Sequence, residues 1–119
     1  MKKNQLVELS MDFAVQIIEL VKFLKQKKES IISGQIGRSG TSIGANISEA
    51  QYAHSKLDFI SKMEIALKES NETDYWLKLL NKSGYIDDCY FKTLDSVCLK
   101  IKLLLIASCK TAKNKQSAF

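Results

Sequence analysis

The sequence predicts an all-α fold, an antiparallel up-down-up-down four-helix bundle that forms a single domain over residues 1–119. The chain contains no proline and only five glycines, too few backbone breakers for the many turns of an all-β fold. Apolar residues make up 45% of the chain and recur at steps of three and four in four long segments, which is the period of one helical face. The connections between these segments are short, so we expect neighbouring helices to be antiparallel.

The first two predicted helices cover residues 5–28 and 30–53. The first has a regular apolar stripe and a run of lysines suited to its C-terminal turn. The second has glycines at every third or fourth position, and each costs about 1 kcal/mol in a helix interior. We expect a neighbouring helix to approach closely there and to offset that cost. The stripe of the first helix is Leu6, Leu9, Phe13, Ile17, Leu20 and Leu24, and the glycines of the second are Gly34, Gly37, Gly40 and Gly44.

The third predicted helix covers residues 55–82. Ser55 followed three residues later by Asp58 is typical of a capping box, in which the hydroxyl and the carboxylate accept early backbone N–H groups. Gly84 follows a basic last turn and predicts a stop, because glycine readily adopts a positive φ.

The fourth predicted helix covers residues 87–113, with Asp87 or Asp88 as its cap. The formal net charge of the chain is +5, and residues 100–119 contain lysines but no Asp or Glu. Such an end is commonly a solvated helix terminus that suits the helix dipole, and the alternative is contact with nucleic acid. The candidate nucleic-acid contacts are Lys100, Lys102, Lys110 and Lys113.

The three cysteines, Cys89, Cys98 and Cys109, are odd in number and lack CxxC spacing. This pattern predicts neither a disulfide framework nor a zinc site, and it favours reduced thiols in the cytoplasm. No run approaches 18 apolar residues, so we expect no membrane span.

The residues give no support for an enzyme, a cofactor or a metal site. His54 is the one histidine, and neither HExxH nor the ExxH spacing of a di-iron bundle occurs. Small polar residues of the second helix are expected to pack between helices rather than to bind a ligand. Arg38 in the same helix is expected to pair with Glu69 or Glu72 of the third.

The stretch Arg38-Ser39-Gly40-Thr41-Ser42-Ile43-Gly44-Ala45-Asn46-Ile47-Ser48-Glu49-Ala50 resembles the motif of the four-helix-bundle proteins encoded in intervening sequences of 23S ribosomal RNA genes. The similarity continues in order through residues 65–72, Tyr75-Trp76-Leu77 and Gly84-Tyr85. The motif positions carried over from the family are Arg38, Ser39, Gly40, Ser42, Gly44, Asn46, Glu49, Glu69 and Glu72.

The resemblance implies an antiparallel four-helix bundle and a ring-shaped homopentamer. A related branch, the accessory variability protein of diversity-generating retroelements, is a basic ring that binds a reverse transcriptase and nucleic acid. The expected function is therefore a homo-oligomeric helical scaffold, with RNA, DNA or a reverse-transcriptase-like protein as a possible partner. The alternative is a structural or selfish-element bundle that has no partner beyond itself.

Overall fold

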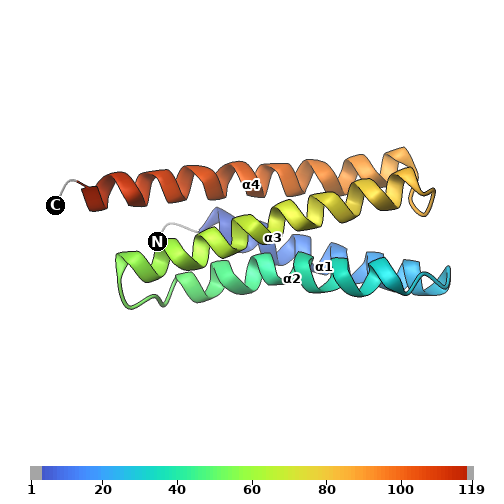
Figure 1. Ribbon diagram of the computed structural model, residues 1–119, viewed down its shortest axis with the longest axis horizontal. Helices are drawn as coiled ribbons and strands as arrows, with labels where there is room; N and C mark the ends of the chain where they lie inside the picture. The colour runs from blue at the N-terminus through green and yellow to red at the C-terminus, as the bar shows by residue number, and fades with distance from the viewer. Residues whose placement is uncertain (1–3, 118–119) are drawn as a thin grey trace.

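The computed structural model describes residues 4–117, with side chains through residue 115. Four helices follow one another in alternating directions and form a rod of 52 × 27 × 21 Å (Figure 1). This arrangement confirms the predicted all-α, up-down-up-down four-helix bundle. The predicted residues 1–3 and 118–119 lie outside the described part. The helices are α1 (Gln5–Gln26), α2 (Ile31–Ala50), α3 (Lys56–Lys82) and α4 (Asp88–Ser117).

The first helix ends at Gln26, two residues before the predicted end, because Lys28 adopts the left-handed conformation with φ 62°. The Glu29 amide then donates to the Leu24 carbonyl at 2.9 Å, and the Lys28 amide donates to the Lys25 carbonyl at 3.0 Å. These two bonds form a Schellman-type ending. Glycine usually occupies the left-handed position, so the lysine found here gave no sequence signal for the stop.

Glu29 caps α2, a role that the sequence pattern did not indicate. Its carboxylate accepts from the backbone amides of Ile31, Ile32 and Ser33 at 2.6–2.9 Å, and only 5% of the residue is exposed. Ser30 occupies the N-cap position but makes no capping hydrogen bond with its side chain. A negative charge at a helix N-terminus is stabilising, because the free amides and the helix dipole favour it.

The second helix ends at Ala50, three residues before the predicted end. The amides of residues 51–53 donate to carbonyls three positions back at 3.0–3.2 Å, and this tighter geometry closes the helix. The Ser55 hydroxyl accepts from the Asp58 amide at 3.0 Å, as a capping box requires. The Asp58 carboxylate, however, accepts from the His54 amide at 3.3 Å instead of from Ser55.

The α3–α4 connection agrees with the prediction, since Gly84 has φ 85° just after α3. The Asp87 carboxylate accepts from the Tyr90 amide at 2.8 Å, so Asp87 rather than Asp88 is the capping residue. The fourth helix continues to Ser117, beyond the predicted end at 113, because no glycine or proline interrupts it.

The core runs along the axis of the bundle, and in α1 it uses the predicted apolar stripe. Leu9 is an exception, because it is only partly buried. The largest fully buried side chains are Phe13, Ile17, Leu20, Leu24, Ile36, Ile43, Ile47, Leu77, Leu80, Leu94, Ile101 and Leu105.

Three of the four glycines in α2 lie against α1, which explains why this helix tolerates them. A Cβ placed on Gly40 would lie 2.8 Å and 2.9 Å from the two γ-carbons of Ile17. A Cβ on Gly44 would lie 3.3 Å from the Ser10 carbonyl oxygen, and one on Gly37 would lie 3.2 Å from Val21. The expected close approach of helices therefore occurs between α1 and α2.

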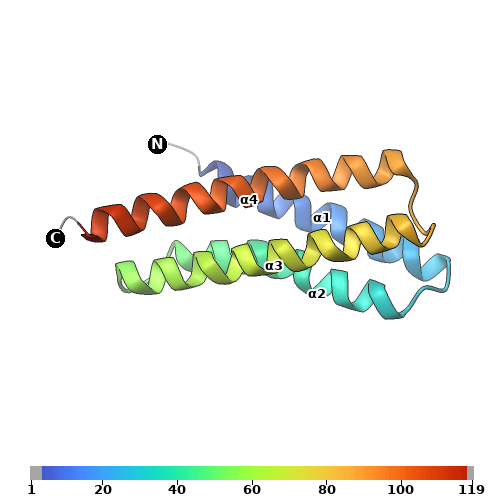
Figure 2. The same ribbon diagram turned by 45° about the horizontal axis from the view of Figure 1, so that its top comes forward.

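The two ends of the rod differ. Figures 1 and 2 show that the last turns of α4 extend past the start of α1, whereas the other end is closed by the α1–α2 and α3–α4 connections. The end that contains the α2–α3 connection is therefore less completely covered by helices.

Candidate functional site

Arg38 of α2 contacts both candidate carboxylates on α3. Its guanidinium donates to Glu69 at 3.1 Å and also donates to Glu72, which in turn accepts from the indole N–H of Trp76 at 3.0 Å. The hydrogen bond to Glu72 raises the pKa of Arg38, and hydrogen bonds from Trp76 and Arg38 lower the pKa of Glu72. Half of the Arg38 side chain is exposed, so this cluster is a surface clamp between α2 and α3.

A pair of buried hydroxyl groups lies beneath this clamp. The Thr73 hydroxyl lies 2.9 Å from the Ser39 hydroxyl and 2.8 Å from the Glu69 carbonyl oxygen, and both side chains are fully buried. Nearby, the Ser70 hydroxyl donates to the carbonyl of Leu67 at 2.7 Å. The hydroxyls thus satisfy one another and the backbone, as buried polar groups must.

The remaining motif residues of α2 also make contacts within the chain. The Asn46 amide donates to the Ser42 carbonyl at 2.9 Å, and Glu49 pairs with Lys62 at 3.6 Å. Gly40 and Gly44 contact α1, as described above. The motif residues therefore make contacts within the chain, although Ser42 and Asn46 contact each other within α2, through the Ser42 backbone carbonyl.

The four candidate lysines of α4 do not form one free basic patch. Lys113 pairs with Glu64 at 2.7 Å, and the half-buried Lys102 is close enough to Asp74 and Asp95 for its charge to lower the pKa of both carboxyls. Lys100 and Lys110 are exposed. The uncompensated charge is smaller than the sequence count suggested, because α3 supplies acidic neighbours to two of the lysines.

A carboxyl pair between α3 and α4 was not predicted from the sequence. Asp95 Oδ1 is buried without a donor among the described residues, and Asp74 is its neighbour. Burial raises the pKa of Asp95 to about 6, and a hydrogen bond between its carboxyl and that of Asp74, together with the negative charge of Asp74, contributes to this shift. Burial alone would raise the pKa of Asp74, but hydrogen bonds from Asp95 and Lys78 lower it below its ordinary value.

The raised pKa of Asp95 makes the stability of the fold depend on pH. The folded state holds the proton of Asp95 more tightly than an unfolded chain does, so ionisation of Asp95 reduces stability as the pH rises from about 4 through about 6. Lys78 and Lys102 moderate the effect, because their charges favour the ionised form. Cys98 lies close by, and burial raises the pKa of its thiol to about 12, so it remains protonated.

The comparisons with known proteins agree with this structural picture. Residues 2–107 match the sequence profile of the family described as 23S rRNA-intervening sequence protein. The chain belongs to the 23S rRNA-intervening sequence protein family. The predicted family is thereby confirmed.

A crystal structure of a member of the S23 ribosomal protein family from Bacteroides thetaiotaomicron is similar to this chain. The two share 49% sequence identity and a TM-score of 0.87, and the alignment covers 88% of this chain and 98% of that chain. That protein is described as having unknown function, and no match emerged among the curated proteins. The family description names no enzymatic activity.

The remaining residues considered for a site are a histidine and three cysteines. His54 is exposed in the α2–α3 connection. The described residues contain no group of three or more His, Cys, Asp or Glu side chains placed to hold a metal ion. Within the same residues, no helix is both long and apolar enough to cross a membrane. Cys89, Cys98 and Cys109 are free thiols.

Proposed function

We propose that the protein is a non-enzymatic helical scaffold that assembles with copies of itself and binds nucleic acid through the lysines of α4. The expected number of copies is five, as the family resemblance implies. The observation that carries the proposal is a pair of apolar stripes exposed on the outside of the bundle. Three free thiols also fit a reducing compartment such as the cytoplasm.

One stripe lies on α1 and the other on α4, and each follows steps of four and three along one helical face. All six side chains are 43–63% exposed. Fully burying a side chain of this size contributes about 1.5–3 kcal/mol, so contact between copies would be favourable. The stripes are Met11, Val15 and Ile18 on α1, and Leu99, Leu103 and Ile106 on α4.

Light scattering coupled to size exclusion tests the assembly. A pentamer of 13.4 kDa chains has a mass of about 67 kDa, five times the chain mass. Ile18→Glu and Leu103→Glu are expected to lower the mass, because each places a charge in an apolar contact. Leu57→Glu is the matched control, since Leu57 is exposed outside both stripes. A monomeric wild-type protein, or equal effects from all three variants, would contradict the proposal.

Nucleic-acid binding is supported by charge rather than by a shaped site. Residues 100–119 contain no acidic residue, and five copies of a +5 chain would carry a formal charge of +25, five times five. Multiple phosphate contacts would make binding strongly dependent on salt.

Filter binding with single-stranded RNA and duplex DNA tests this part of the proposal. Affinity is expected to fall at least about tenfold between about 0.05 M and 0.2 M salt. The double variant Lys100→Ala/Lys110→Ala should bind more weakly than Lys22→Ala/Lys25→Ala, which removes the same charge from α1. If the wild-type protein retains no nucleic acid at low salt, the nucleic-acid part of the proposal is wrong, and the alternative of a bundle without a nucleic-acid partner is favoured.

A further inference from the structure

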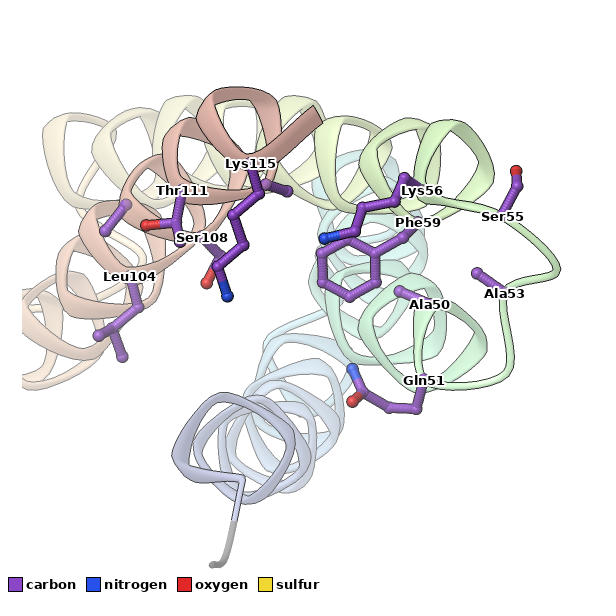
Figure 3. A pocket seen from close by; sticks show the side chains of 12 residues that line it. Ala50, Gln51, Ala53, Ser55, Lys56, Phe59, Leu104, Ser108, Thr111 and Lys115 are labelled. Carbon is purple, nitrogen blue, oxygen red and sulfur yellow. The ribbon is translucent and has the colours of Figure 1, made fainter. Parts of the chain in front are cut away.

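An open cavity of about 660 Å³ lies at the less covered end of the bundle, between α4 and the α2–α3 connection (Figure 3). Its volume is within the usual range for small-molecule sites. One wall is formed by the end of α2 and the start of α3, including Phe59, and the other is formed by α4, including Leu104.

Small side chains create this space. After Leu105, the inner side of α4 carries the half-buried Ser108 and the buried Cys109 and Ala112, all of them smaller than leucine. Ala50 lies on the opposite wall from Ser108, at the end of α2. The apolar lining is therefore continuous with the hydrophobic core but is not filled by the chain itself.

Two lysines from opposite walls border the opening. Figure 3 shows Lys56 of α3 and Lys115 of α4 extending toward the space between the walls. Neither lysine forms an ion pair with a carboxylate among the described residues, and the cavity lining contains no Asp or Glu. The Ser108 hydroxyl likewise has no hydrogen-bond partner among those residues.

We propose that this cavity binds a small amphiphilic organic anion, with its alkyl body against Phe59 and Leu104 and its carboxylate between Lys56 and Lys115. An apolar body is favoured because half of the lining residues are alanine, leucine or phenylalanine. A single anionic head is favoured because the two ammonium groups lack acidic partners there. A nucleic-acid strand fits less well, since the cavity offers one aromatic ring and no series of stacking platforms. This site goes beyond the scaffold function and does not depend on it.

Calorimetric titration of the full chain with sodium octanoate tests the proposal, with octanol as the uncharged probe of the same length. Octanoate is expected to bind in the range up to about 1 mM. Lys56→Met/Lys115→Met should weaken octanoate about tenfold and change octanol less than about twofold, because only the head loses its partners. Lys22→Met/Lys25→Met on α1 is the charge-matched control and should change neither.

A substitution that fills the cavity tests the contact with the alkyl chain separately from the contact with the carboxylate. Ser108→Leu should weaken both probes at least about tenfold, because it occupies the space for the alkyl chain. Circular dichroism checks that each variant keeps its helical content. The proposal is wrong if octanoate shows no binding up to about 10 mM, if both lysine pairs affect it equally, or if Ser108→Leu leaves it unchanged. It is also wrong if the protein binds anionic phospholipid vesicles but not free octanoate.

Discussion

Replacing Gly40 by alanine tests how closely α1 and α2 approach. The added Cβ would lie 2.8 Å, 2.9 Å and 3.3 Å from Cγ1, Cγ2 and Cβ of Ile17. Carbon atoms normally pack at about 3.5–4.0 Å, so several tenths of an ångström must be gained. Rotation of Ile17 cannot relieve all three contacts, because its own Cβ is involved and the side chain is fully buried. The helices themselves must move apart.

The net effect combines two opposing terms. Alanine favours the helix by about 1 kcal/mol over glycine, whereas overpacking a core contact costs about 1–3 kcal/mol. We therefore expect Gly40→Ala to reduce the free energy of unfolding by up to about 2 kcal/mol. Gly34→Ala is the matched control in the same helix, because a Cβ there meets no atom within 4 Å. It should stabilise the protein by about 0.5–1 kcal/mol.

Urea unfolding at one fixed protein concentration, followed by circular dichroism at 222 nm, measures the difference. Fixed concentration matters because assembly would make stability depend on it. If Gly40→Ala proved as stable as Gly34→Ala, the close contact with Ile17 would be wrong. Gly40→Leu is a harsher version that should disrupt folding or assembly, and unchanged thermal stability and oligomeric mass would contradict this placement.

Three further outcomes are expected. Asp95→Asn should raise the free energy of unfolding at pH 7 by about 1 kcal/mol and flatten the decline of stability between pH 4 and 7. A pKa raised from 3.8 to about 6 corresponds to at most about 3 kcal/mol before solvent screening. An unchanged urea midpoint at both pH values would oppose this. A double-mutant cycle between Arg38 and Glu72 should give a coupling different from zero, and strict additivity would mean that the clamp contributes nothing. Thr73→Val should cost about 1–2 kcal/mol in urea unfolding, because the buried Ser39 hydroxyl loses its partner; a neutral change would show that another group satisfies it.

Several features of the site could be predicted from residue spacing. Arg38 is the lone cation of a small-residue helix, and the structure places it against both Glu69 and Glu72, which share a face of α3. Gly84 predicted the end of α3, because a glycine after a basic turn has both the conformational freedom and the position to stop a helix. These features depend on residues close in sequence or on one helical face.

Other features had no local signal. Glu29 caps α2 with its carboxylate although serine is the usual capping residue, and Lys28 takes a left-handed conformation that glycine normally occupies. Asp74 and Asp95 lie on different helices, and their shared environment depends on how α3 and α4 are rotated against each other. The compensation of Lys113 by Glu64 also requires that contact.

The sequence by itself determined the four helices, their alternating direction and their family, because apolar period, glycine position and motif order are properties of the chain alone. Only the tertiary structure decided which α4 lysines have acidic neighbours, which glycines contact α1, and where the bundle leaves an open cavity. The physical reason is that charge compensation, close packing and empty space depend on distances between helices. These distances follow from the packing of all the side chains together.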